Sequence, residues 1–329
     1  MRAHRPALCS ALLLAASLWG GASQADEIAV GNYAVSANGM PYAVAMAKGF
    51  FKEEGADVTG IISSGGGGTS LRNMLTGTVA FGEVNPGAVI SAIQQGADLK
   101  IISDDVLTVG EFIWAVKPDS PIKSIKDFKG KKLGYTNPKS TSLALAAMLM
   151  EKAGYKAEDA EMVKTGGFGE GVAALDVGLI DVAAIPEPLW SNFKTKYRPV
   201  ATAAQYLPPL DNVVGVTTSA QAASKAPFIR AVIRARRRAV LFMKQNPDEA
   251  GDIVAKVYNV ESPVGRSAVR YLTTVMTDGL PYWGEGEIHM EGLRRMVALQ
   301  TSIGAITGTV DLDKMVDTEF LPDDLKAIK

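Results

Sequence analysis

The chain has 329 residues, with 34 Lys and Arg against 35 Asp and Glu, so its net charge is −1. This near-neutral balance argues against a nucleic-acid partner, because such a partner favours a strong basic excess. Of the one cysteine and two histidines, only His289 lies outside residues 1–25, which is too few for a zinc site built from Cys and His, and we expect no metal and no cofactor.

Residues 1–25 have the features of a secretory signal peptide. Two arginines precede an apolar run at 11–18, which is too short to span a membrane, and Ser23-Gln24-Ala25 is a small-x-small cleavage site. Cleavage removes the only cysteine and leaves His289 as the only histidine. We therefore expect a periplasmic protein without disulfides, long enough to fold around an ordinary core in two domains.

Short apolar runs alternate with helical patterns up to about residue 216. This alternation predicts an α/β fold with parallel sheets. The expected strands, in chain order, are Ile28–Tyr33, Val58–Ser63, Val79–Gly82, Leu99–Ser103, Phe112–Val116, Lys132–Tyr135, Glu161–Lys164, Ile180–Ala184 and Val213–Thr217.

Helices with recognisable ends lie between these strands. Pro41 suits the first turn of a helix that ends at Gly49. Thr69 is expected to cap a second helix, and Ser140 or Thr141 a third.

The layout of these elements recurs about 101 residues along the chain. Ile62–Gly66 matches Val163–Gly167, and Gly77–Phe81 matches Gly178–Val182. A proline-bearing turn follows in each half. Chance similarity between α/β units is one explanation, but the order of elements recurs in full. We interpret it as two lobes of like topology.

Ligands of open α/β sheets bind beyond the carboxyl ends of the strands. If two such lobes face each other, six loops surround the ligand: Ser36–Met40, Ser64–Thr69, Glu83–Pro86, Thr136–Ser142, Thr165–Gly171 and Ile185–Trp190. The candidate ligand-binding residues are Asn38, Met40, Tyr42, Ser64, Gly65, Gly66, Thr69, Glu83, Asn85, Thr136, Asn137, Lys139, Ser140, Thr141, Gly167, Phe168, Glu187 and Trp190.

The loop chemistry leaves the charge of the ligand open. Lys139 at a helix start would favour an anionic group, whereas Glu83 or Glu187 facing inward would favour an amine or a ring N–H. Each of these charges, taken alone, is more often solvated or a local cap. The glycine run Gly65–Gly68 is not a nucleotide P-loop, because no Lys follows it, and a flexible turn is the plain alternative.

Five arginines gather on one expected helix: Arg230, Arg234, Arg236, Arg237 and Arg238. A nucleic-acid or membrane surface is one interpretation. An apolar stripe faces much of that charge, so a solvated face of a packed helix is the favoured one.

Several motifs together resemble a known family. They are Met40-Pro41-Tyr42, Ala47–Gly55, the Gly-rich turn before Thr69, Gly77–Gly82, Asp127–Gly134, Ala184–Leu189 and Asn246–Ala250. Their sequence is similar to that of the nitrate/sulfonate/taurine-type substrate-binding proteins of ABC transporters, which include relatives that bind thiamine-pyrimidine precursors. The resemblance runs from about residue 28 to 255.

The resemblance implies a two-lobed type II periplasmic binding protein fold with a ligand cleft between the lobes. Lobe I would comprise 26–116 plus 213–329, with C-terminal helices, and lobe II 117–212. The chain would cross between the lobes near Val116-Lys117 and near Asp211-Asn212. The sequence departs from the family at Asn137–Thr141, where many sulfonate-type members have a Gly-Ser-Ser-like turn.

The function implied is that of a monomeric solute-binding component of an ABC importer. It would capture a small organic anion, such as a sulfonate, carboxylate or aromatic acid, by closing its lobes, and deliver it to a membrane permease without chemistry. A pyrimidine-like heterocycle is the alternative ligand. An exported enzyme using Glu83 and Glu187, or a sensor acting on a membrane receptor, is the alternative function.

Overall fold

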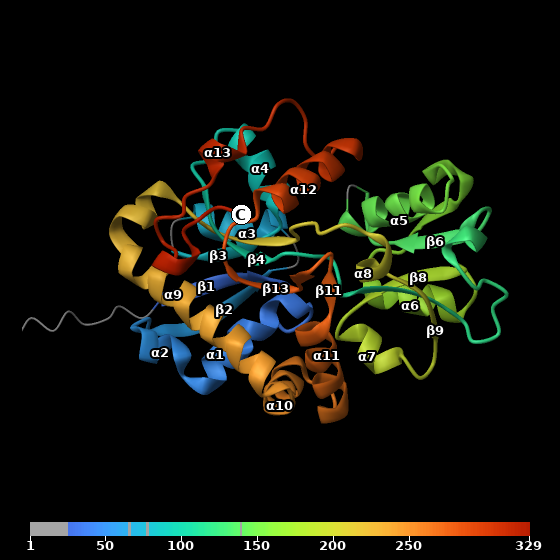
Figure 1. The fold of residues 1–329 in the computed structure, drawn as a ribbon, viewed down its shortest axis with the longest axis horizontal. Coiled ribbons are helices and arrows are strands. Elements are labelled where there is room, and N and C mark those ends of the chain that lie inside the picture. Colours follow the sequence, from blue (N-terminus) through green and yellow to red (C-terminus); the bar gives the residue numbers. More distant parts are fainter. Residues whose placement is uncertain (1–25, 65–66, 77–78, 139) are drawn as a thin grey trace, which may run out of the picture.

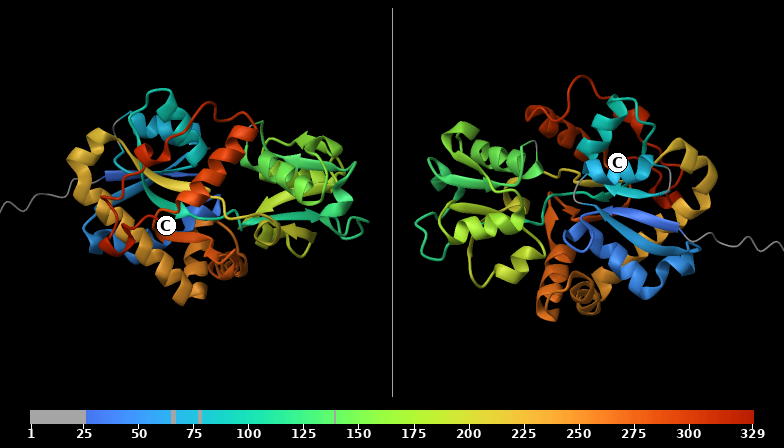
Figure 2. Two further views of the ribbon diagram at one scale, coloured as in Figure 1. Left: turned by 45° about the horizontal axis from the view of Figure 1, so that its top comes forward. Right: turned by 180° about the vertical axis from the view of Figure 1, so that it is seen from behind.

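The computed structural model describes residues 26–64, 67–76, 79–138 and 140–329. They form two lobes, each built around one β-sheet with helices packed on it (Figure 1). The two further views in Figure 2 show the same separation into a larger and a smaller lobe. The predicted α/β class is confirmed. The expected signal peptide, residues 1–25, lies outside the described residues.

The sheet of the larger, first lobe has six strands in the order β13-β4-β10-β3-β1-β2. Their bounds are β1 Asp26–Gly31, β2 Val58–Ser64, β3 Gly82–Val84, β4 Lys100–Val106, β10 Val213–Thr217 and β13 Trp283–Gly286. Strand β1 is parallel to β2 and β3, whereas β10 is antiparallel to both of its neighbours.

The sheet of the second lobe has five strands in the order β7-β6-β8-β5-β9. Their bounds are β5 Phe112–Val116, β6 Lys132–Tyr135, β7 Glu161–Lys164, β8 Val182–Pro186 and β9 Arg198–Thr202. Strand β6 is parallel to β7 and β8, and β5 is antiparallel to β8 and β9.

The two sheets share one topology, as the repeat in the sequence predicted. The order β2-β1-β3-β10-β4 corresponds to β7-β6-β8-β5-β9. The fourth strand of this order is β10 in the first lobe and β5 in the second. Each follows directly after the chain has crossed from the other lobe. Each is antiparallel to its neighbours, so the expectation of parallel sheets is wrong for β5 and β10.

The first crossing lies one strand earlier than expected. Because β5 pairs with β8 and β9, the chain leaves the first lobe after β4, through residues 107–111, and the expected crossing near Val116-Lys117 is wrong. The second connecting segment is residues 207–212, after the short helix α8, and it contains the expected Asp211-Asn212.

Helices cover both faces of each sheet. In the first lobe they are α1 Met40–Lys48, α2 Phe50–Glu54, α3 Gly67–Leu75, α4 Pro86–Gln94, α9 Ser219–Gln245, α10 Pro247–Tyr258, α11 Ser262–Thr274, α12 Met290–Ser302 and α13 Leu312–Met315. In the second lobe they are α5 Thr141–Lys152, α6 Phe168–Asp176, α7 Leu189–Phe193 and α8 Ala203–Tyr206. A two-stranded ribbon, β11 Met276–Thr277 and β12 Leu280–Pro281, and four 3-10 turns at Ala37–Gly39, Ile125–Phe128, Ala157–Asp159 and Asp323–Leu325 complete the described fold.

Most helix ends follow the local sequence. Helix α1 ends at Gly49, whose φ of 74° suits a residue without a side chain. Ser140 caps α5, because its hydroxyl accepts a hydrogen bond from Leu143 N at 3.3 Å. The predicted cap at Thr69 is wrong, since Thr69 lies inside α3. None of the helices within the described ranges has the length and apolar character needed to cross a bilayer.

Helix α12 ties the two lobes together. It begins in the first lobe, yet Met296 and Leu299 are buried in the hydrophobic core of the second lobe. The other large core surrounds the first sheet and includes Ile28, Ile101 and Val214. The lobes are therefore joined by two connecting segments and by one shared helix.

Candidate functional site

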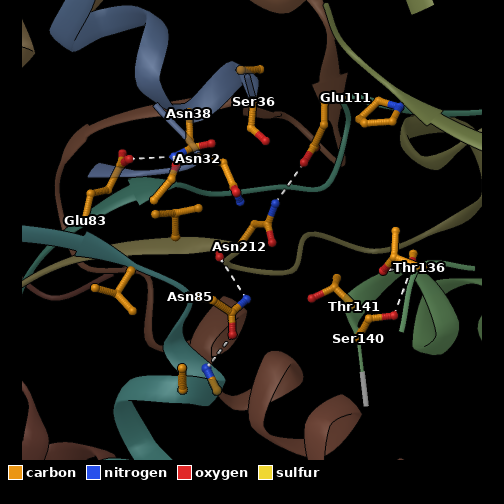
Figure 3. Close-up of a pocket in the computed structure, with 18 of the residues that line it drawn as sticks. Asn32, Ser36, Asn38, Glu83, Asn85, Glu111, Thr136, Ser140, Thr141 and Asn212 are labelled. Atoms are coloured by element: carbon orange, nitrogen blue, oxygen red, sulfur yellow. Dashed lines mark hydrogen bonds between the residues drawn. The ribbon is translucent and has the colours of Figure 1, made fainter. Parts of the chain in front are cut away.

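A cavity of about 500 Å³ lies between the two lobes. Its lining includes Gly31 at the end of β1, Val84 at the end of β3, Thr136 just after β6 and Pro186 at the end of β8. The carboxyl ends of the parallel strands of both sheets therefore meet at this cavity, as expected for open α/β sheets. Figure 3 shows its polar side chains converging from the two lobes.

Glu83 and Asn38 form the first-lobe wall of the cavity. Asn38 Nδ2 donates to Glu83 Oε2 at 2.7 Å and to Gly31 O at 2.9 Å (Figure 3). Glu83 is fully buried, and its Oε1 has no hydrogen-bond partner among the described residues. Burial and the nearby Asp105 carboxylate raise the pKa of Glu83 well above its ordinary value, although the Arg236 guanidinium opposes them.

A buried ion pair, Asp105 and Arg236, lies close enough to Glu83 to affect its pKa. Tyr42 donates to Asp105 Oδ2 at 3.0 Å, and Arg236 Nε is 3.5 Å from Asp105 Oδ1. Arg236 also donates to Gly284 O at 2.8 Å and to Asp105 O. Arg236 thus pairs with Asp105, and among the described residues it acts on Glu83 only through its charge, without a hydrogen bond or ion pair.

The connecting segments contribute a third group of polar side chains. Asn212 Nδ2 donates to Glu111 Oε1 at 2.8 Å, which joins the second segment to the first. Asn85 Nδ2 donates to Asn212 O at 3.2 Å, and Asn85 Oδ1 accepts from Gly87 N, which caps α4. Burial raises the pKa of Glu111 to about 8, and the hydrogen bonds from its own backbone N–H and from Asn212 oppose this rise.

The second-lobe wall begins with hydroxyl groups at the start of α5. Ser142 Oγ accepts from Thr136 N at 3.0 Å and lies 3.0 Å from Thr136 Oγ1 and 2.9 Å from Ser140 Oγ. Beside them the rings of Phe112 and Phe168 are 5.5 Å apart between centroids and tilted by 59°. This wall therefore combines hydroxyl groups with an aromatic surface.

Glu187 lines the cavity just before the start of α7. Its two oxygens accept from Ser191 N and Ser191 Oγ, each at 3.0 Å. Burial raises the pKa of Glu187 to about 7, against the lowering effect of the Ser191 hydrogen bonds. Ser191 Oγ is also 2.9 Å from Ser267 Oγ on α11, so this carboxyl adjoins a direct contact between the lobes.

Three buried carboxyl groups therefore line the cavity: those of Glu83, Glu111 and Glu187. Within the described part of the chain, the lining contains neither Lys nor Arg. A carboxylate in a dry site is unfavourable unless it accepts hydrogen bonds or meets a cation. The cavity is thus suited to a molecule that brings N–H donors or positive charge.

The structure brings eight of the eighteen candidate residues to the cavity: Asn38, Glu83, Asn85, Thr136, Ser140, Thr141, Phe168 and Glu187. Gly65, Gly66 and Lys139 lie outside the described residues. Ser64 is the last residue of β2.

Six other candidates do not line the cavity. Met40 and Tyr42 are buried in the first-lobe core. Thr69 accepts a hydrogen bond from Arg72, and the exposed Asn137 donates to Gly166 O. Gly167 precedes α6 beside a smaller hollow in the second lobe, and Trp190 packs against the core under α6.

Among the polar cavity residues that were not predicted as candidates, Glu111 and Asn212 share a position. Glu111 immediately precedes β5 and Asn212 immediately precedes β10. Both strands are antiparallel to their neighbours, so their amino ends lie at the edge where the other strands have their carboxyl ends. The carboxyl-end rule does not point to such residues, although the expected crossing at Asp211-Asn212 did mark one of them.

The chain is similar to several known proteins. Residues 36–250 match the model of the family described as NMT1/THI5 like. A riboflavin-binding protein, RibY of Chloroflexus aurantiacus, is 26% identical over 300 residues, which are 86% of this chain and 82% of that protein.

Two solved structures illustrate the shared fold. The periplasmic aliphatic sulphonate binding protein SsuA of Escherichia coli superimposes with a TM-score of 0.75 at 17% identity, over 90% of this chain and 92% of that one. The periplasmic nitrate-binding protein NrtA of Synechocystis PCC 6803 gives a TM-score of 0.69 at 12% identity, over 90% and 86%. The predicted periplasmic binding protein fold is therefore confirmed, as is the predicted resemblance to this type of protein.

Proposed function

Because this chain belongs to the NMT1/THI5-like family, we propose that it is the periplasmic solute-binding component of an ABC importer. The observation that carries the proposal is the polar cavity between two lobes of like topology, lined by side chains from both. The protein captures a small molecule there and presents the loaded, closed form to a membrane permease.

The mechanism is closure of the lobes around the ligand. A ligand held by Asn38 and Glu83 on the first lobe gains contacts with Thr136 and Ser140 on the second only when the lobes approach. It therefore binds the closed state more tightly and shifts the equilibrium toward that state. Burial also excludes water, which strengthens each hydrogen bond that the cavity makes.

The ligand class that the cavity favours is a nitrogen-bearing heterocycle or a related cation. Three buried carboxyl groups supply acceptors, and the rings of Phe112 and Phe168 supply aromatic contacts for a ring of the ligand. RibY, whose name states that it binds riboflavin, is consistent with this class.

A small organic anion, the class favoured by the sequence, is the second candidate. The hydroxyls at the start of α5, the helix starts of α4 and α5, and the sulphonate- and nitrate-binding structural neighbours favour it. The carboxyl groups oppose it, because an anion beside Glu83, Glu111 and Glu187 would be repelled wherever they are ionised.

A screen of thermal unfolding separates the two classes. Three donor probes (riboflavin, 4-aminopyrimidine and benzamidine) and three anions (taurine, nitrate and benzoate) are each added in excess. A ligand that binds only the folded protein raises its melting temperature. We expect at least one donor probe to raise it and the anions to leave it unchanged, whereas a response to anions alone would contradict the proposed ligand class.

Mass spectrometry of the bound probe tests whether the protein converts it chemically. Unchanged probe after long incubation supports a binding protein. A new product would favour the alternative of an enzyme on the same fold that uses the carboxyl groups of the cavity.

A further inference from the structure

Glu111 lies where four parts of the molecule meet. It is the last residue of the first connecting segment, and its side chain accepts a hydrogen bond from Asn212 of the second segment. Its backbone oxygen accepts from Glu187 N of the second lobe at 3.0 Å. Its neighbour Gly110 accepts from Tyr271 Oη of α11, in the first lobe, at 2.9 Å.

The second carboxyl oxygen of Glu111 is not used by these contacts. Glu111 lines the cavity and is 5% exposed, and its Oε2 has no hydrogen-bond partner among the described residues. Figure 3 shows the carboxyl at the edge of the cavity, with Asn212 on the side of Oε1. A buried acceptor without a partner is costly, so a donor placed at Oε2 would bring an unusually large gain.

We propose that Glu111 is a ligand-binding and specificity-determining residue of the hinge, whose Oε2 accepts a hydrogen bond from an N–H or amidinium group of the ligand. This inference rests on the proposed function and goes beyond it by naming the atom and the chemical group. Oε1 meanwhile keeps the hydrogen bond from Asn212.

The position of Glu111 couples this contact to closure. The Glu111–Asn212 hydrogen bond joins the two segments on which the lobes turn, and Asn85 attaches the same Asn212 to the start of α4. A ligand that fixes the Glu111 carboxyl therefore also fixes the relative placement of the two segments. The ligand is recognised best in the hinge geometry that permits both hydrogen bonds.

Two substitutions separate the roles of the two oxygens. In Glu111→Gln the side-chain carbonyl keeps the bond from Asn212, and the amide NH2 then turns a donor toward the cavity. Glu111→Met has a similar length and no hydrogen-bonding atom. Glu158→Gln is the matched control, because its carboxyl lies on the surface of the second lobe with 76% of the side chain exposed.

Calorimetric titration with riboflavin, 4-aminopyrimidine and benzamidine is performed at pH 8.5, where the Glu111 carboxyl is largely ionised. We expect both Glu111 variants to bind at least about tenfold more weakly than the wild type, the loss of one hydrogen bond to a charged group. The Glu158→Gln protein should keep the wild-type affinity. The melting temperature of each variant without probe shows that it is folded.

Each outcome bears on the inference separately from the proposed function. A wild type that binds a donor probe while Glu111→Gln and Glu111→Met bind it equally well overturns the role of Glu111 and leaves the solute-binding function standing. A wild type that binds only taurine, nitrate or benzoate, or no donor probe, overturns the inference together with the nitrogen-bearing ligand class.

Discussion

The Glu83 carboxyl faces the cavity with one oxygen bonded to Asn38 and the other without a described partner. Arg236, the nearest buried cation, is paired with Asp105. A positive or N–H-bearing ligand would therefore supply the missing partner. The same reasoning applies to Glu111, because a donor placed at Oε2 would remove the cost of a buried acceptor without a partner.

The buried Glu111 carboxyl makes stability depend on pH. Its pKa of about 8 in the folded protein lies above the value of 4.5 for a free carboxyl, so the folded state binds more protons between these values. The free energy of unfolding should therefore fall as pH rises from about 5 to 8. Glu111→Gln removes this loss, and we expect it to be more stable than the wild type at pH 8.5 by on the order of 3 kcal/mol, with little difference at pH 4.5.

Thermal unfolding of both proteins across this pH range measures the effect. Glu158→Gln is again the control, and its curve should keep the wild-type shape because its side chain stays in water. Wild-type and Glu111→Gln curves that run parallel from pH 4.5 to 8.5 would contradict the burial of an ionisable group at this position.

Individual side chains were only partly predictable from the sequence. Glu83 and Glu187 follow the carboxyl-end rule and were predicted, whereas Glu111 precedes an antiparallel strand and was missed. Arg236 was expected on a solvated helix face, yet it is 2% exposed and pairs with Asp105. Its neighbours Arg234 and Arg238 do lie at the surface, paired with Glu54. A helical pattern predicts on which face of the helix Arg236 lies. It does not predict the ion pair with Asp105, which belongs to the distant strand β4.

Helices α10 and α11 pack closely enough to require two glycines. A Cβ on Gly251 would lie 2.4 Å from Arg266 Cα, and one on Gly265 would lie 2.3 Å from Gly251 O. Helix α11 carries both Ser267, which meets Ser191 of the second lobe, and Tyr271, which holds the first connecting segment. The close packing of these helices thus positions two contacts near the cavity.

Gly251→Ala should therefore destabilise the protein by about 1–3 kcal/mol, because the backbone of α11 must move to admit the methyl group. Gly169→Ala in α6 is the matched control, since its Cβ would meet nothing within 4 Å. We expect the control to keep or slightly raise the melting temperature. Equal melting temperatures for the wild type and Gly251→Ala would contradict the packing described.

The positions of the strands in the sequence were easier to predict than the strands with which they pair. The bounds of two strands, Phe112–Val116 and Val213–Thr217, were predicted as observed. An apolar run does not indicate which sheet the strand joins. Strand β5 was therefore assigned to the wrong lobe. The third strand of the first sheet was expected at Val79–Gly82 and lies at Gly82–Val84, because a glycine-bounded apolar run fixes strand ends only loosely.

The described residues form two like sheets whose edges at the cavity meet across two connecting segments and α12. The sequence predicted this architecture through its repeat and its family resemblance. The ligand class was less predictable, because it depends on which charges become buried together, and that is a property of the assembled lobes.

Hydrogen–deuterium exchange, measured by mass spectrometry with and without a saturating donor probe, shows whether a ligand binds between the two lobes. Amides that are buried by a ligand or by closure exchange more slowly. We expect simultaneous protection of segments from both lobes and the hinge, at 31–38, 83–91, 107–112, 140–145 and 185–191. Protection confined to one lobe, or to a surface away from these segments, would contradict a ligand site between the lobes.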